Sequence, residues 1–239
     1  MNVSNDARNE TMEWIKLNGC LIPAAGPATD VWPEEREARR MMRRRGALMM
    51  RCTASLDRCT PGEGWFIVKE RFGGLEELSA STRSKVRRAL RRCSYRRFTD
   101  RLDPQTEHWE IYSREEGRRI GFALVRVYGR EVFYDRFRAD ARYLRGYYPL
   151  YGLLYEMNRH YLAERKLERV SDGFRTMRER SGVQLFLVEK FRFRRAYCRT
   201  ALYYRPWFGS VVRTLYPFRD WLPGEGIRAL MRQHGLFGK

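Results

Sequence analysis

The hydrophobic pattern of this chain changes period several times, and each change predicts a new element of secondary structure. Residues 33–46 ("PEEREARRMMRRRG") predict a helix, because Pro33 suits a first turn and Gly46 follows the last basic residues. Apolar runs at 47–54 and 65–70 predict two strands. The Pro- and Gly-rich stretch before Pro33 predicts that residues 1–32 are irregular.

A basic helix is predicted over residues 75–92, where "LEELSASTRSKVRRALRR" has apolar positions at helical spacing. The apolar stripe consists of Leu75, Leu78, Val86 and Leu90. The other faces carry Arg83, Lys85, Arg87, Arg88, Arg91 and Arg92. The helix should therefore pack one face on a core and present cations on the rest.

The middle of the chain predicts a β-hairpin followed by a long helix. Residues 118–139 indicate two strands joined at Gly129-Arg130, a Gly-X pair that suits a two-residue turn. The first of them, "GFALVRV", is apolar on both faces, which is typical of a central strand. Residues 147–166 predict the long helix, and "SYRRFTD" before the hairpin predicts a short strand.

The last part of the chain predicts a strand, a buried helix, another strand and a helical tail. The ranges are 167–173, 180–191, 194–204, and two short helices near 208–215 and 224–234. Ser181 suits the cap of the middle helix, whose apolar circumference predicts deep burial, with Phe191 and Phe193 turned inward. The whole order predicts an α/β or α+β fold in which helices flank a mixed central sheet.

Charge adds an expectation about partners. The chain has 48 Lys and Arg against 29 Asp and Glu, a net charge of +19. This excess predicts attraction to RNA, DNA, an anionic membrane surface or a phosphorylated cofactor, although solubility or a compositional bias explains it equally well. No apolar run approaches the roughly 20 residues that span a bilayer, so we expect a soluble cytoplasmic protein.

Several kinds of site are not indicated. The five cysteines form no CxxC pair and the three histidines are far apart, which predicts reduced thiols and no metal site. No phosphate-binding Walker loop, GxSxG motif or HExxH motif occurs, so the sequence does not suggest a kinase, serine hydrolase or metalloprotease.

Three stretches in order resemble the GNAT-fold acyltransferases and their Fem-type relatives. They are "WFIVKE…LEELSASTRSKVRRALRR", the hairpin "RIGFALVRVYGREVFYD" before a long helix, and "VEKFRFRRAY". The resemblance covers residues 34–204 and implies a GNAT-like domain over 33–205, with an extension over 206–239. It also implies that the strand before the long helix splays from its neighbour and that the N-terminus of this helix receives the cofactor, an acyl-CoA.

The chain departs from the family at three places, one of which is Arg192, where the family usually has a glycine before the phenylalanine. The expected Gly-rich pyrophosphate loop is replaced by "RGYYPLYG", in which Gly146 and Gly152 are not close together. The family tyrosine that often protonates the departing thiolate aligns with Val188, which has no proton to give. Fem-type relatives use aminoacyl-tRNA, so the resemblance leaves open whether the carrier is acetyl-CoA, another acyl-CoA or an RNA.

Candidate residues follow from this chemistry, each with an ordinary structural alternative. We expect Arg145, Gly146 and Tyr147 to bind phosphate at the long helix, and Val125 and Val127 to pair with the cofactor. Candidate bases are Asp135, for which pairing with an arginine is the alternative, and Asp172, whose "SDG" is also a common turn. Tyr197 is a candidate proton donor, although rim tyrosines usually serve packing.

Two functions remain open from the sequence. One is an acyltransferase that moves an acyl or aminoacyl group from acyl-CoA or a related carrier to an amine acceptor. The other is a catalytically silent GNAT-like module that binds tRNA, another RNA or another polyanion through Arg83, Lys85, Arg87 and Arg88. For these four residues, a solvated helix face is the structural alternative.

Overall fold

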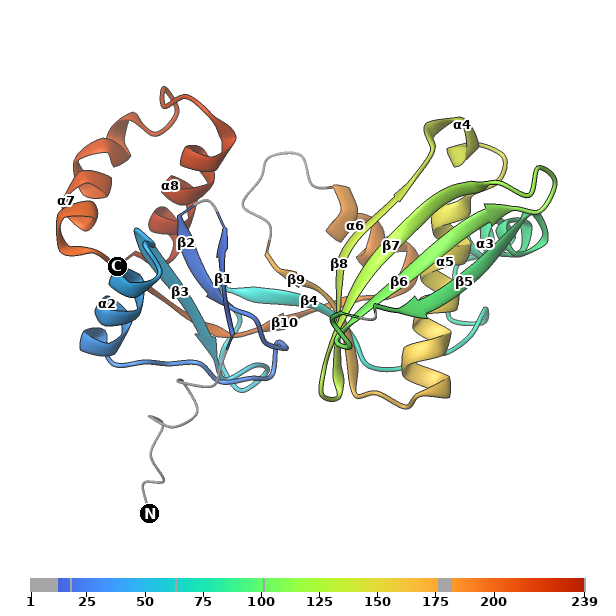
Figure 1. Cartoon of the computed structure of the whole chain (residues 1–239), viewed down its shortest axis with the longest axis horizontal. Helices are drawn as coiled ribbons and strands as arrows, with labels where there is room; N and C mark the ends of the chain where they lie inside the picture. Colours follow the sequence, from blue (N-terminus) through green and yellow to red (C-terminus); the bar gives the residue numbers. More distant parts are fainter. Residues whose placement is uncertain (1–12, 18, 63, 101, 176–181, 239) are drawn as a thin grey trace, which may run out of the picture. The chain divides into compact units, whose positions relative to one another are not determined.

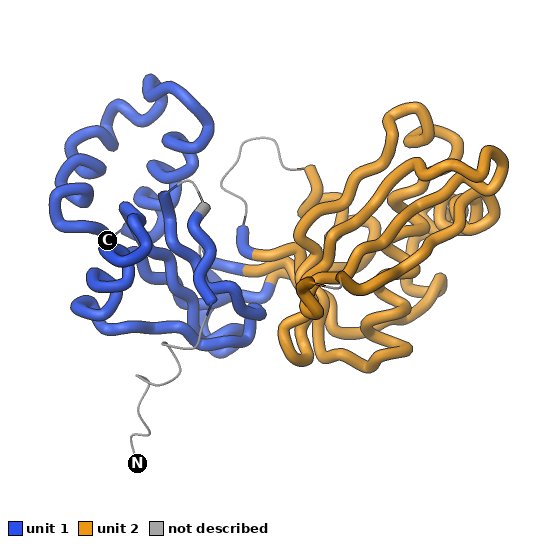
Figure 2. The backbone as a smooth tube through the Cα atoms, viewed as in Figure 1, with its two compact units in different colours: residues 1–65, 174–181, 196–239 blue, residues 66–173, 182–195 orange. Residues whose placement is uncertain are grey.

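The computed structural model describes residues 13–17, 19–62, 64–100, 102–175 and 182–238. These residues form two compact units (Figure 2). Unit 1 comprises the described parts of 1–65, 174–181 and 196–239, and unit 2 comprises those of 66–173 and 182–195. The expected segment boundaries near residues 32 and 205 both fall inside unit 1, because the two ends of the chain share one unit.

Unit 1 is built on a four-stranded sheet with the order β1-β2-β3-β11. Its strands are β1 (Trp14–Leu17), β2 (Cys20–Pro23), β3 (Met49–Ala54) and β11 (Arg199–Tyr204). Its helices are α2 (Glu35–Arg44), α7 (Pro206–Leu215), the 3-10 turn η2 (Tyr216–Phe218) and α8 (Glu225–Phe237). Strands β2 and β3 are parallel, whereas β1 pairs with β2 and β11 pairs with β3 antiparallel.

The expectation of an irregular segment over 1–32 was wrong for its described part, which contains β1 and β2. Trp14 and Leu21 on these strands are buried in a core with Ala38 and Met42 of α2. Strands of four residues are too short to show a clear alternation, so their pairing with each other and with β3, and not the sequence pattern, identifies them.

Unit 2 contains most of a seven-stranded mixed sheet with the order β10-β4-β9-β8-β7-β6-β5 (Figure 1). Its strands are β4 (Trp65–Lys69), β5 (Cys93–Thr99), β6 (Thr106–Ser113), β7 (Arg119–Tyr128), β8 (Glu131–Ala139), β9 (Arg169–Phe174) and β10 (Arg194–Tyr197). Its helical elements are α3 (Ala80–Arg92), α4 (Ala141–Leu144), α5 (Pro149–Asn158), the π-helical η1 (Arg159–Glu164) and α6 (Gly182–Phe191). The predicted α+β class, with mixed sheets flanked by helices, is confirmed.

The predicted hairpin is also confirmed. Strands β7 and β8 pair antiparallel from Tyr128↔Glu131 onwards, and Gly129 takes the positive φ of +59° that its turn requires. Strand β7 lies between β6 and β8, as its two apolar faces predicted. The neighbouring strand β6 was not predicted, because its buried positions include polar residues such as Thr106 and Glu107.

Two predictions near the end of unit 2 need correction. The single strand expected over 194–204 is divided into β10 and β11, which belong to different sheets. Helix α6 is not buried all round, because Val183 and Leu185 are 41% and 59% exposed. Its proposed cap, Ser181, lies outside the described residues, whereas Phe191 and Phe193 are buried as predicted.

The basic helix α3 begins at Ala80 rather than at residue 75, because Ser79 caps it. The Ser79 hydroxyl accepts a hydrogen bond from the Thr82 N–H at 3.3 Å. We expect Ser79→Ala to lower the free energy of unfolding by about 1 kcal/mol, since one N–H of the first turn loses its acceptor. Urea denaturation measures this change. Ser84→Ala, at an exposed position of the same helix, is the control, and an equal loss in both variants would contradict the cap.

No helix in the described part of the chain is long and apolar enough to cross a membrane.

Candidate active site

The site begins where β8 and β9 separate. These parallel strands pair only at Glu131↔Arg169, Val132↔Val170 and Phe133↔Ser171, near the start of both strands (Figure 1). From Tyr134 to Ala139, β8 has no described strand along this edge. An edge of this kind presents backbone N–H and C=O groups that a bound molecule can use.

A β-bulge lies on the same part of β8. The register with β7 passes from Leu124↔Arg136 to Val125↔Tyr134, so Asp135 has no residue opposite it. Bulges bend a strand and redirect its side chains, and they are common next to active sites. The Asp135 carboxylate forms an ion pair with Arg126 at 3.6 Å, which is the structural role that the sequence offered as its alternative.

Asp172 lies immediately after Ser171, the last residue of β9 that pairs with β8. Its half-buried carboxylate accepts a hydrogen bond from the side chain of Gln184 on α6. Burial raises the pKa of Asp172 from its ordinary value of 3.8 to about 7, although the Gln184 hydrogen bond acts in the opposite direction. A carboxylate with this pKa can accept a proton near neutral pH and release it again.

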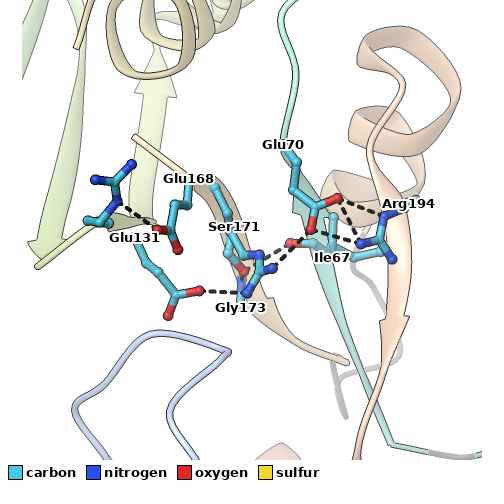
Figure 3. Close-up of polar contacts among 9 residues, drawn as sticks. Ile67, Glu70, Glu131, Glu168, Ser171, Gly173 and Arg194 are labelled. Atoms are coloured by element: carbon cyan, nitrogen blue, oxygen red, sulfur yellow. Dashed lines mark hydrogen bonds and ion pairs between the residues drawn. The ribbon is translucent and has the colours of Figure 1, made fainter. Parts of the chain in front are cut away.

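The backbone around Asp172 is held by a polar cluster (Figure 3). The buried Ser171 hydroxyl donates to the Ile67 carbonyl and accepts from the Gly173 N–H, both at 2.9 Å. Ser171 therefore links β9 to β4 just before Asp172, and it stabilises the backbone turn at Gly173 just after it. Gly173 has a φ of +92°, and a Cβ there would lie 2.7 Å from the Phe133 ring.

Ion pairs hold the beginning of β9 between its two neighbouring strands. The Arg169 guanidinium donates to Glu131 of β8 at 2.8 Å and to Glu70, which follows β4, at 3.0 Å. Arg194 of β10 donates to the same Glu70 carboxylate at 2.8 Å. Figure 3 shows Glu70 and Glu131 on opposite sides of β9. The strand is thus held at the first of its three paired positions with β8, three residues before Asp172.

The predicted phosphate-binding residues lie in the short link between α4 and α5. Gly146 has a φ of +86° and open space where a Cβ would be. The Tyr147 hydroxyl donates to Glu115 at 2.5 Å, and Arg145 is exposed. Helix α5 then begins at Pro149 without a side-chain cap, so it presents the positive end of the helix dipole. Pro149 has no N–H, and the Tyr151 N–H donates to the Tyr148 carbonyl at 2.9 Å.

The basic helix α3 brings cations to the aromatic residues at this N-terminus. The Lys85 ammonium lies 5.5 Å from the ring centre of Tyr148 and 5.2 Å from that of Tyr151. The Arg88 guanidinium lies 5.9 Å from the Tyr148 ring, and Arg92 lies 4.8 Å from the Tyr147 ring. The predicted phosphate site and part of the predicted polyanion site are therefore a single region.

Close packing of α3 against α5 depends on Gly152. A Cβ at this position would lie 2.0 Å from the Tyr95 hydroxyl and 2.9 Å from the Ala89 Cβ.

Among the described residues, no carboxylate forms an ion pair with Lys85, Arg88 or Arg92, so their charges are available to an anion. The other two members of the predicted set differ, because Arg83 pairs with Glu76 at 3.0 Å and Arg87 is simply exposed.

Other sequence-based candidates lie elsewhere. Val125 and Val127 are on β7, where Val125 pairs with both Glu107 and Tyr134, so neither strand edge is open at that residue. The open edge belongs to the next strand, β8, because the divergence follows the second strand of the hairpin. Both hairpin strands are apolar, so the pattern alone did not distinguish them.

Tyr197 is the last residue of β10 and belongs to unit 1, where its backbone carbonyl accepts a hydrogen bond from the Asp57 N–H at 2.7 Å. Its role as a proton donor remains a prediction. Val188 lies half-buried on α6. Ser171 and Gln184 were not predicted from the sequence, because serine and glutamine have no distinctive local pattern. In the described chain, no group of three His, Cys, Asp or Glu side chains is placed to hold a metal ion.

No family model matches this sequence, and no curated protein matches it. Among solved structures, the chain is similar to L-PGS from Bacillus licheniformis, with 12% identity, coverage of 81% of this chain and 80% of that chain, and a TM-score of 0.49. It is also similar to FemX, with 12% identity, coverage of 81% and 73%, and a TM-score of 0.47.

A tandem GNAT protein from the clavulanic acid biosynthesis pathway is similar at 10% identity, over 77% of this chain and 75% of that chain, with a TM-score of 0.43. With these identities and TM-scores, the likeness assigns no activity, carrier or substrate to this chain. FemX and a GNAT protein, representatives of the two groups that the sequence resembles, are thus among the solved structures to which the chain is similar.

Proposed function

We propose that this protein is an acyltransferase that moves an acyl or aminoacyl group from a phosphate-bearing carrier to an amine. The observation that carries the proposal is the position of Asp172 at the divergence of β8 and β9. There, a carboxylate whose pKa is raised to about 7 lies beside an open strand edge. A base and a set of backbone donors at one place are what acyl transfer to an amine requires.

In the proposed reaction, the acceptor amine attacks the carbonyl carbon of the acyl group. A C–N bond forms, and the C–S bond of a thioester or the C–O bond of an ester breaks. Asp172 takes the proton that the amine loses, and the departing sulfur or oxygen takes up a proton from its surroundings. Backbone N–H groups of β8 beyond Phe133 stabilise the negative charge that develops on the carbonyl oxygen.

The carrier's phosphates are assigned to the N-terminus of α5 and to Lys85, Arg88 and Arg92. A helix N-terminus favours anions, and the guanidinium and ammonium groups add full charges that have no described carboxylate partner. Acetyl-CoA, another acyl-CoA and aminoacyl-tRNA all present phosphates to such a region. The same cations favour the second candidate function, a silent module that binds RNA.

Binding measurements on the full chain distinguish these carriers. Calorimetry with CoA, acetyl-CoA and tRNA at low and high salt should show binding of at least one of them. Lys85→Ala with Arg88→Ala should weaken that binding by roughly tenfold or more, since two charge-assisted contacts are lost. The control, Arg36→Ala with Arg40→Ala on α2, removes the same charge from exposed positions of unit 1.

The outcomes are distinct. Similar weakening in both double variants would show that net charge, and not this region, attracts the carrier. Binding of tRNA with a steep salt dependence, together with no transfer to any amine, would support the silent RNA-binding module. If none of the three carriers binds, the proposed function is wrong.

A further inference from the structure

Exposed apolar side chains are concentrated near the C-terminus in unit 1. Trp207, Val211 and Leu215 of α7 are 57%, 39% and 36% exposed. Their spacing of four residues places them along one side of the helix, whereas its buried residues, Gly209 and Val212, face a different side. The exposed series continues beyond α7 with Phe218 and Trp221, which are 52% and 85% exposed, and whose ring centres are 6.2 Å apart.

Arginines lie next to the beginning of this stripe. The Arg205 side chain, immediately before α7, donates to the Met42 carbonyl at 3.0 Å and to the Arg43 carbonyl at 3.5 Å. This contact places the end of α2 beside the start of α7. The residues at that end are Arg43, Arg44 and Arg45, all exposed, and in the described part of the chain none of them forms an ion pair with a carboxylate.

We propose that α7 and the turn after it attach unit 1 to the surface of an anionic lipid bilayer. Tryptophan and phenylalanine favour the boundary between head groups and acyl chains, and an apolar helix stripe can insert there without crossing the bilayer. Arginines beside the stripe supply the attraction to anionic head groups. The apolar stripe and the cations occupy neighbouring parts of one unit, which is the combination that such a surface binds.

Co-sedimentation of the full chain with vesicles tests this attachment. The protein should bind phosphatidylcholine vesicles that contain phosphatidylglycerol, and should bind vesicles of phosphatidylcholine alone much more weakly. Trp207→Ser with Val211→Ser and Leu215→Ser should reduce the partition coefficient roughly tenfold or more, because apolar area no longer enters the interface. The double variant Arg43→Gln with Arg44→Gln should reduce the partition coefficient roughly fivefold for each charge removed. High salt should also reduce the partition coefficient, because it screens the attraction to the head groups.

Controls and contrary outcomes separate this proposal from others. Leu185→Ser removes an exposed leucine from unit 2 and should leave the partition coefficient unchanged. Circular dichroism establishes that each variant is folded. No binding to the anionic vesicles, or equal binding by the triple variant, overturns the proposal. Light scattering that shows a wild-type dimer and a monomeric triple variant would instead assign the stripe to a second copy of the chain. These results do not depend on the proposed transfer activity.

Discussion

Asp172→Asn is expected to remove transfer activity and at the same time to stabilise the protein at alkaline pH. The asparagine side chain has nearly the same shape but cannot accept the amine proton, so the rate should fall by roughly 10²- to 10⁴-fold. In the wild type, kcat/KM should rise as the pH increases through about 7, because only ionised Asp172 acts as a base. The acylated form of the carrier that binds in calorimetry, acetyl-CoA or an aminoacyl-tRNA, serves as the donor in this assay.

The stability effect has a definite sign. The pKa of Asp172 is about 7 in the folded chain, above its ordinary value of 3.8, so between these values the folded chain retains a proton that the unfolded chain releases. The wild-type free energy of unfolding therefore falls as the pH rises from about 4 to about 7. Asparagine has no such proton, so the advantage of Asp172→Asn should grow by roughly 2 kcal/mol between about pH 5 and pH 8.

Two further variants complete this experiment. Asp220→Asn, a change of the same kind at an exposed site in unit 1, should show neither effect. Asp135→Asn tests the other candidate base, whose carboxylate pairs with Arg126. Loss of activity in Asp135→Asn alone would transfer the role of base to Asp135. Full activity in both variants would exclude the proposed bases, whereas the stability measurement would still report whether Asp172 is buried.

Arg169→Leu is expected to cause the largest loss of stability among the changes considered. Arg169 is the cation between Glu70 and Glu131, and both its own side chain and that of Glu131 are largely buried, at 16% and 9% exposed. Removal of the guanidinium takes from the largely buried Glu131 its ion pair with Arg169, whereas Glu70 keeps its ion pair with Arg194. We expect the free energy of unfolding to fall by about 3 kcal/mol, measured by denaturant titration of the full chain.

The neighbouring pair of Arg130 and Glu168 provides the control for this variant. Its side chains are 69% and 55% exposed, so Arg130→Leu removes a pair that water already screens. The expected loss is about 0.5 kcal/mol or less. Equal losses in Arg130→Leu and Arg169→Leu would mean that burial does not distinguish the two pairs and that the cluster in Figure 3 does not hold β9.

Local patterns were sufficient for the elements that repeat a period over many residues. The hairpin around Gly129 was predicted because the largely apolar run of β7 is followed by Gly129-Arg130, a pair that suits a two-residue turn. The basic helix was predicted from its stripe, and its start was misplaced only because the sequence has acidic and apolar residues before the Ser79 cap. Strands β1 and β2 were missed because four residues show no period.

Long-range contacts decided the division of residues 194–204. The amino acids of this segment show one continuous strand pattern, but Arg194–Tyr197 and Arg199–Tyr204 belong to two different sheets. Between them, the Cys198 N–H donates to the Gly64 carbonyl at 3.0 Å. A pattern within one segment contains no information about which strand lies beside it, so this break was not visible in the sequence.

The sequence by itself determined the α+β class, most of the helices and strands, the excess of positive charge and the identity of Asp172 as a candidate base. Only the tertiary structure decided that β8, and not β7, has the open edge. It also decided that burial raises the pKa of Asp172, and that Lys85 and Arg88 lie against the tyrosines at the start of α5. Periodicity and composition are properties of neighbouring residues, whereas burial, strand edges and charge clusters depend on residues that are distant along the chain and meet only after folding.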